Sequence, residues 1–228
     1  MSNFDSDGGP DNEWDERGEL AWNEFDWERY LREQDEAVYR YVQFYEAAKG
    51  SADRIDAVAE KMNWGRSDWS DDSAPAADED DDDEDDLDFD DEDDVYTLHK
   101  NPIFIATKAI YLSLRRSWEF TAADATQVPQ PMAVSLLASL HHGEEQSVQA
   151  IHALDFGDYA MAISLFKRSL SALNGSLALL NADVVANQPA VRAWREDSLP
   201  KLFDLREIWL RVITECRQEL DRPVDDDS

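Results

Sequence analysis

The residues of this chain whose types and spacing come nearest to known chemistry are two histidines and a glutamate in its second half. His141, Glu145 and His152 follow one another at intervals of four and seven residues. On an α-helix these intervals place the three side chains on one face, and imidazole and carboxylate groups commonly bind transition metals. A metal-binding or enzymatic bundle with this site between helices is therefore one alternative hypothesis. The Glu-x-x-His pairs that diiron bundles use do not occur in the sequence, so our main prediction contains no metal and no cofactor.

The single cysteine, Cys216, does not indicate catalysis. It falls on the apolar face of the last predicted helix, where a thiol behaves as a small hydrophobic group. No arrangement of serine, histidine and aspartate can be argued from the sequence, and the glycine-rich motifs that bind nucleotides are missing from it. We predict no catalytic residue and favour a protein that is not an enzyme.

A run of acidic residues divides the chain. Fifteen of the seventeen residues from 78 to 94 are Asp or Glu. Such a segment cannot bury enough apolar surface to offset the entropy of ordering, so we expect a disordered linker over residues 66–94. Its plainest role is to solubilise, but acidic groups with spaced apolar residues also suit a basic protein partner, and a mimic of nucleic-acid charge is a further alternative. The candidate contact residues in the run are Asp82, Asp83, Glu84, Leu87 and Phe89.

A second set of candidate contact residues is aromatic and lies on the first predicted helix. Apolar residues recur there every three or four positions, as on one face of a helix. The aromatic part of this stripe is wider than one packing seam needs. Part of it is expected either to fill the core or to form a partner groove or a homo-oligomer surface, since Trp and Tyr often supply large contacts at interfaces. The candidates are Trp27, Tyr30, Tyr41 and Phe44.

The charge distribution limits the classes of partner. The formal net charge is −31, whereas residues 101–222 hold 12 basic and 14 acidic side chains and are nearly neutral. Phosphate backbones and anionic membranes are bound through Lys and Arg, so we predict neither a nucleic acid nor a membrane as ligand. A protein with a basic surface is the expected complement. The acidic N-terminus lacks the pattern of a signal peptide, no uncharged stretch is long enough to span a bilayer, and one cysteine suits a reducing cytoplasm.

Helical periodicity is the only regular pattern in the chain, so the predicted fold class is all-α. After an acidic leader over residues 1–18, which we expect to be disordered, the pattern predicts a helical hairpin over residues 19–65. Gly50 would end its first helix and Ser51 would cap its second. The hairpin either packs on the rest of the chain or pairs with another subunit.

Order is expected to return at Val95 and to continue to residue 222. Asn101 followed by Pro102 predicts a helix start. Three more helices are expected at about 131–154, at 159–184 and after a turn at 187–189. Pro200 should kink the last of these, or force a fresh start capped by Ser198. Four helices of similar length with short connections predict an antiparallel four-helix bundle over about 101–221, followed by an acidic tail at 223–228.

The turn before the third of these bundle helices resembles part of a known repeat. A glycine, an aspartate and spaced apolar residues there are similar to the second half of a tetratricopeptide repeat, a family of helix pairs that bind peptides. The resemblance covers one repeat unit at most, with no second copy one repeat length away. We interpret it as a tight turn between helices. The residues concerned are Gly157, Asp158, Tyr159, Ala162, Ile163, Phe166 and Leu170.

These observations favour a non-catalytic helical module for protein–protein interaction, such as an adaptor, a scaffold or a regulatory subunit. Its acidic linker would be able to engage a basic partner.

Overall fold

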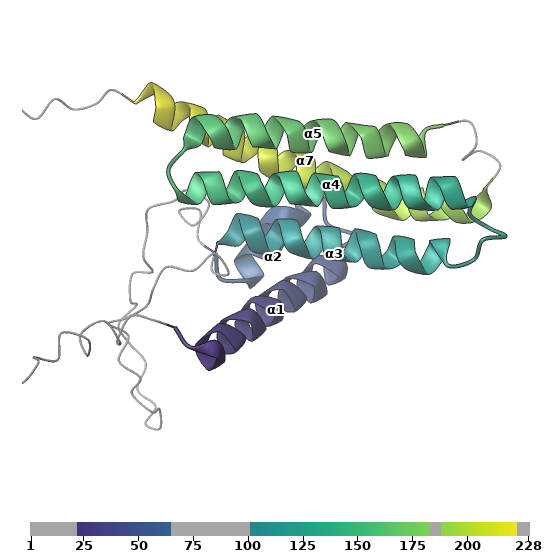
Figure 1. Cartoon of the computed structure of the whole chain (residues 1–228), viewed down its shortest axis with the longest axis horizontal. Helices are drawn as coiled ribbons and strands as arrows, with labels where there is room; N and C mark the ends of the chain where they lie inside the picture. Colours follow the sequence, from purple (N-terminus) through teal and green to yellow (C-terminus); the bar gives the residue numbers. More distant parts are fainter. Residues whose placement is uncertain (1–21, 65–100, 183–187, 223–228) are drawn as a thin grey trace, which may run out of the picture.

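The computed structural model describes residues 22–64, 101–182 and 188–222. Within these ranges the chain forms six helices and no strand, which confirms the all-α prediction (Figure 1). The leader, residues 65–100 with Val95, residues 183–187 and the tail from residue 223 lie outside the described ranges. The helices are α1 (Glu24–Ala47), α2 (Arg54–Lys61), α3 (Pro102–Ala122), α4 (Gln130–Asp155), α5 (Tyr159–Leu180) and α7 (Pro189–Asp221).

Helices α3, α4, α5 and α7 form the predicted antiparallel bundle. Each packs against the next in chain order, and α7 closes the ring by packing against α3. The connection from α4 to α5 is only three residues long, and the chain reverses there through Gly157 at φ 71°. A positive φ suits a residue without Cβ. The Asp158 side chain then accepts a hydrogen bond from the Met161 amide at 2.9 Å. The tight turn predicted from the sequence is therefore present.

The predicted start of α3 is also confirmed. The Asn101 side chain accepts hydrogen bonds from the amides of Ile103 and Phe104, at 2.9 and 3.1 Å, and Pro102 occupies the first turn. Almost the whole first half of α3 is buried, because α1, α4 and α7 all pack around this helix. Helix α3 is thus the centre of the molecule.

Three predicted boundaries were wrong. Helix α1 begins at Glu24 rather than at residue 19, because Asn23 caps it. Helix α2 follows Asp53 at the cap position rather than Ser51, and no side chain bonds to its first amides. Helix α5 continues through Asn174 and Gly175 as predicted, but it ends at Leu180 rather than at residue 184.

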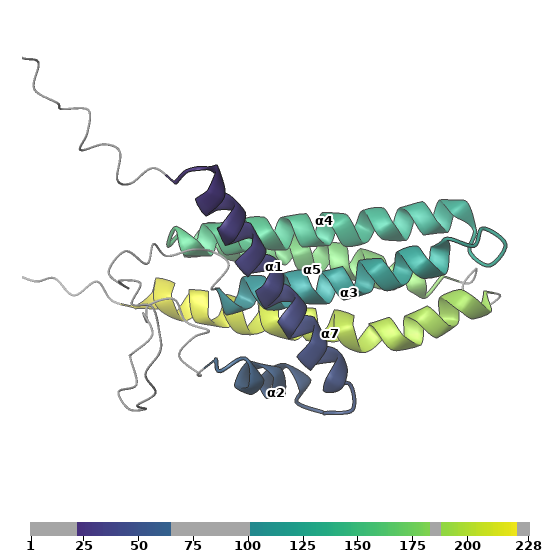
Figure 2. The ribbon, with the colours of Figure 1, turned by 90° about the horizontal axis from the view of Figure 1, so that it is seen from below.

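Helix α7 is continuous through Pro200, where the sequence predicted either a kink or a new helix start. Pro200 lies inside it, and the helix bends along its length (Figure 2). The Ser198 hydroxyl is buried without a hydrogen-bond partner, so it caps nothing. Proline has no backbone N–H, so α7 lacks one backbone hydrogen bond at Pro200. Burial of residues on both sides of it, including Trp194 and Leu202, holds the helix together.

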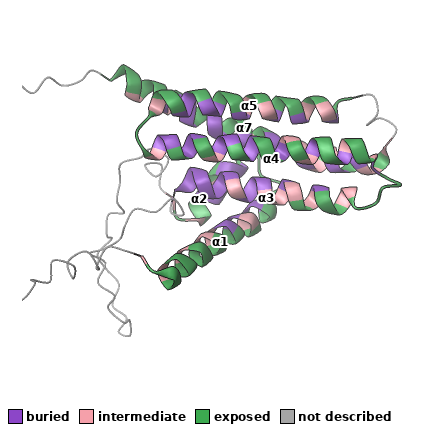
Figure 3. Ribbon diagram, in the orientation of Figure 1, coloured by how far each residue is buried: buried purple, intermediate pink, exposed green. Residues whose placement is uncertain are grey.

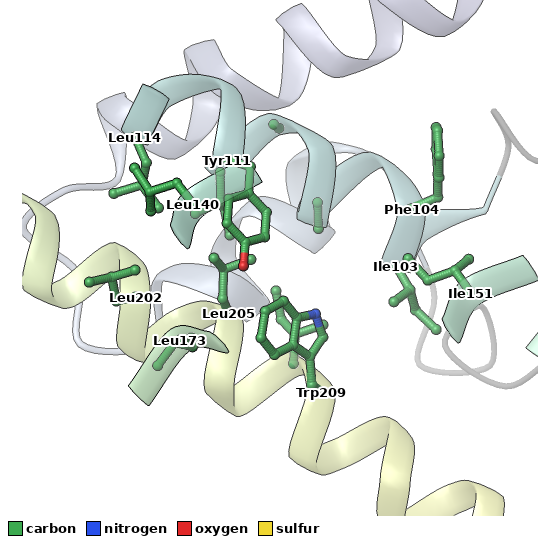
Figure 4. Packing of buried hydrophobic residues seen from close by; sticks show 14 of the residues in the cluster. Ile103, Phe104, Tyr111, Leu114, Leu140, Ile151, Leu173, Leu202, Leu205 and Trp209 are labelled. Atoms are coloured by element: carbon green, nitrogen blue, oxygen red, sulfur yellow. The ribbon is translucent and has the colours of Figure 1, made fainter. Parts of the chain in front are cut away.

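One hydrophobic core joins the bundle and the hairpin. The Tyr111 and Trp209 rings stack with centroids 6.1 Å apart between α3 and α7 (Figure 4). Trp118 is fully buried, and its indole N–H donates to the Ala133 carbonyl oxygen at 3.0 Å. The same core includes Tyr41 of α1. The hairpin therefore packs on the bundle of its own chain, with α1 crossing α3 obliquely (Figure 2).

Candidate functional site

The first half of α1 runs past the edge of the bundle and carries exposed apolar side chains (Figure 1). Trp27 and Leu31 are 52% and 51% exposed, whereas Val38 and Tyr41 on the same helix are 6% and 0% exposed. Burial colouring shows the same division along α1 (Figure 3). Neighbouring exposed apolar groups often mark a surface that another protein covers. We call residues 24–36 the projecting half of α1.

Local interactions make the projecting half helical. The Asn23 side chain accepts hydrogen bonds from the amides of Phe25 and Asp26, at 2.8 and 3.3 Å, and the Asp26 carboxylate accepts the Asn23 amide at 3.0 Å. This reciprocal arrangement satisfies amides that the first turn leaves unpaired. One turn on, Arg32 donates to Glu28 at 2.9 Å. Such contacts stabilise a helix by a few tenths of a kcal/mol each, so the free end of α1 is supported without tertiary packing.

An aromatic cluster lies at the start of the projecting half. The ring of Trp22 is 4.8 Å from that of Trp27 and 5.5 Å from that of Tyr30, measured between centroids. The Trp27 and Tyr30 rings are 5.8 Å apart, and all three pairs meet edge to face. Edge-to-face contacts contribute roughly 0.5–1.5 kcal/mol each beyond their area. The cluster therefore holds the Trp27 ring in place at the surface.

The other half of α1 is fixed to the bundle through buried polar groups. Asp204 of α7 accepts hydrogen bonds from the Tyr45 hydroxyl and from Arg54 Nε, the latter at 2.8 Å. Arg54 is 6% exposed, and its guanidinium lies 4.2 Å above the Tyr45 ring. Burial, and next the Asp204 carboxylate, raise the pKa of Tyr45, so its hydroxyl stays protonated and remains a donor. These contacts set the angle at which α1 leaves the bundle.

The four aromatic candidates named from the sequence do not share one environment. Trp27 is exposed and Tyr30 is half-buried, as a contact surface requires. Phe44 is half-buried near Lys61, whose Nζ lies 6.0 Å from the ring centroid. Tyr41 is fully buried and stacks on Trp64 at 5.6 Å. Tyr41 therefore belongs to the core and cannot contact a partner while α1 stays packed. The acidic candidates Asp82, Asp83, Glu84, Leu87 and Phe89 lie outside the described residues.

The three residues of the metal alternative do not converge. His141 and Glu145 line a shallow cleft between α3 and α4 with a volume of about 470 Å³, and His152 is not part of its lining. Within the described ranges, no three His, Cys, Asp or Glu side chains lie close enough together to hold a metal ion. His141 Nε2 instead lies 3.3 Å from a guanidinium nitrogen of Arg115.

The cleft contains an ion cluster that sequence reasoning missed. The Glu144 carboxylate, 8% exposed, lies 2.9 Å from Lys108 Nζ and 3.1 Å from Arg115 Nε. One buried anion thus has two cations, and this arrangement links α3 to α4. The partners are about thirty or more residues apart in sequence, so no local pattern announced them. The charges of the cluster are thus paired, although the buried Arg115 Nε makes no hydrogen bond.

Sequence reasoning also missed that Leu31 is exposed and that acidic residues border the stripe on the projecting half. The exposure of Leu31 depends on where α1 packs on the bundle, which the sequence does not give. The acidic character of the projecting half could have been found, because residues 24–36 hold six acidic side chains and two basic ones. Acids next to exposed aromatic groups are a feature that a charge count along the helix reveals.

Among the residues that the structure describes, none of the helices combines the length and apolar character needed to cross a bilayer. Comparisons with protein-family models, with curated proteins and with solved structures gave no match for this chain.

Proposed function

We propose that this protein acts by non-catalytic contact with another protein, as an adaptor, a scaffold or a regulatory subunit, and that its partner has a basic surface. The observation that carries the proposal is the apolar stripe of α1, which continues from the core onto an exposed surface at Trp27 and Leu31. Surfaces that bind proteins are enriched in large aromatic groups. The projecting half of α1 presents such groups on a capped helix.

The charge of the chain supports the choice of partner. The acidic run at 78–94 and the acidic projecting half would both attract a basic protein over several ångströms and speed its encounter. Attraction between exposed charges weakens as salt rises. We place this contact in the cytoplasm, since a chain with a single cysteine, Cys216, gains no disulfide from an oxidising compartment.

A pull-down from native lysate, at low and moderate salt, tests the proposal. The full chain is compared with a chain that lacks residues 78–94. We expect the full chain to retain an identifiable protein with a basic surface, in amounts that fall as salt rises, and the shortened chain to retain less of it at low salt. If the full chain retains no such protein at either salt concentration, the proposed function is wrong. If both chains retain the same amount, the acidic run has no part in capture.

A further inference from the structure

We propose that the projecting half of α1 binds as a helix in an apolar groove of the partner protein, and that Lys or Arg residues border this groove on both sides. The inference rests on the proposed function and deepens it, because it names the binding mode and the chemistry of the partner surface. Helices that lie in grooves are recognised through apolar residues spaced three and four positions apart.

The apolar face of α1 continues from the core into the projecting half. At 3.6 residues per turn, Trp27, Leu31 and Val38 fall on the same face. That face is buried against the bundle from Val38 onwards, and it is open at Trp27 and Leu31. The exposed residues therefore extend an existing interface beyond the point where this chain covers it. The partner is expected to take over where the bundle ends.

Acidic side chains lie around that face. Each residue turns the helix by about 100°, so Asp26 lies on one side of the apolar face and Glu28 and Asp35 on the other, whereas Glu33 falls farther round, towards Arg29. Glu28 and Asp35 are exposed, and Asp26 is half-buried. Acidic groups thus line both edges of the face that carries Trp27.

The two basic residues of the projecting half lie elsewhere. Arg29 and Arg32 fall on the side of the helix away from Trp27, and both are exposed. Their guanidinium groups nevertheless reach two of these carboxylates, since Arg29 lies 3.7 Å from Asp26 and Arg32 lies 2.9 Å from Glu28. A surface that covers the apolar face would therefore meet ion-paired carboxylates at its edges, within a segment whose net charge stays at −4. Opposite charges at the rim of an interface fix orientation and raise the rate of association. A groove bordered by Lys and Arg meets this requirement.

The same charges argue against two other occupants. Residues 24–36 carry a net charge of −4 within a chain of −31. A second copy would place two acidic surfaces against each other, and like charges at an interface oppose binding. An anionic membrane surface would repel the projecting half for the same reason.

Site-specific photo-crosslinking tests the binding mode, because α1 offers a matched control. A photo-reactive amino acid replaces Leu31 in one full-length chain and Phe25 in another. Phe25 is 73% exposed, but it lies on the opposite face from Trp27. Each chain is irradiated in native lysate, and the crosslinked peptide of the partner is identified by mass spectrometry. The Trp27→Ala exchange is then combined with the reactive group at position 31.

We expect position 31 to crosslink to an apolar surface of one protein that is bordered by Lys and Arg, and position 25 to give little or none of this product. Trp27→Ala should reduce the product, because loss of an aromatic hot spot weakens binding by roughly 30-fold or more. The inference is overturned if both positions react equally, if the only product joins two copies of this chain, if the mapped surface lacks basic residues, or if neither position reacts. A partner retained in the pull-down but not crosslinked from position 31 would leave the proposed function intact and refute only the binding mode.

Discussion

The ammonium group of Lys201 on α7 lies 2.6 Å from a carboxylate oxygen of Glu46 on α1, and the lysine is 3% exposed. The same nitrogen donates to the Ser113 hydroxyl of α3 at 2.8 Å and lies 3.5 Å from Asp197. A buried ammonium is tolerated only when such partners surround it. Lys201 therefore links α7 to Glu46 of α1 and to Ser113 of α3, where the hairpin meets the bundle. These contacts hold in place the helix that we propose as the binding element.

Removal of the carboxylate is predicted to destabilise the fold. Glu46→Ala leaves Lys201 buried with weaker partners, which should lower the free energy of unfolding by about 1–3 kcal/mol. In the double variant Glu46→Ala/Lys201→Met neither charge remains, and most of this loss should be recovered. Glu36→Ala, which changes an exposed acid of the same helix, is the control and should stay within about 0.5 kcal/mol of the parent. Urea denaturation measures all three. A double variant as unstable as Glu46→Ala would refute this account of the pair.

The pair also predicts how stability depends on pH. Burial raises the pKa of Glu46, but hydrogen bonds from Lys201 and Ser113 outweigh it, so the net pKa lies below the ordinary 4.5. An acid with a lowered pKa contributes stability above its unfolded pKa and loses it as pH falls through the folded value. The difference in Tm between the parent and Glu46→Gln should accordingly be full above about pH 5.5 and shrink below pH 4.5. A difference that stays constant down to pH 3 would contradict the assignment.

Two glycines in helices predict opposite effects of the same substitution. A Cβ on Gly143 would clash with the Tyr111 hydroxyl oxygen, whereas one on Gly175 would lie 3.7 Å from its nearest neighbour, the Ser139 hydroxyl oxygen. Ala is favoured over Gly inside a helix by about 1 kcal/mol. Gly175→Ala should therefore raise stability by about 0.5–1 kcal/mol, and Gly143→Ala should lower it by about 1–3 kcal/mol because of the overlap.

Thermal denaturation checks both glycine variants. Tyr111→Phe removes the atom that clashes, so it should relieve part of the cost of Gly143→Ala. If Gly143→Ala is as stable as Gly175→Ala, α4 does not approach Tyr111 as closely as the structure shows. Nothing next to Gly143 in the sequence indicates this contact. The reason for a glycine at this position lies on another helix.

How far the sequence predicted the fold can be judged from α1 itself. Its apolar period correctly predicted a helix, and Asn101 with Pro102 correctly predicted the start of α3. The period is the same at Trp27 as at Tyr41, yet one side chain is exposed and the other is buried. The spacing of apolar residues shows which face of a helix is apolar. How much of that face is covered depends on the packing of α1 on α3.

Contacts between distant residues were beyond the sequence for a related reason. Glu144 meets Lys108 and Arg115 across two helices, and nothing local to any of the three indicates it. Pro200 predicted either a kink or a fresh start, and the structure shows a continuous, bent helix, as expected of the first alternative. Local chemistry thus predicted the elements, and the arrangement of the elements determined which side chains form the candidate site.

Asn23 and Asn101 cap their helices with the same chemistry but differ in their surroundings, so replacing them should have different effects. Asn23 caps the projecting half of α1, roughly 22 Å along the helix from Val38, the first buried residue. Asn101 caps α3 with the same pair of amide bonds, but it is 8% exposed and the first residues of its helix are buried. Loss of such a cap costs about 1 kcal/mol. Asn101→Ala should therefore lower the global free energy of unfolding by about that amount.

Asn23→Ala should instead leave global unfolding nearly unchanged and act only on the projecting half. Hydrogen exchange at the amides of residues 27–31 should become several-fold faster, because that part of α1 can fray without opening the core. Exchange at Tyr41 and Tyr45, which are buried, should not change. Fraying would also weaken binding to the partner, since the frayed turns must be ordered again when the complex forms. If Asn23→Ala lowers global stability as much as Asn101→Ala, the projecting half is part of the cooperative core, and its role as a separate binding element would have to be abandoned.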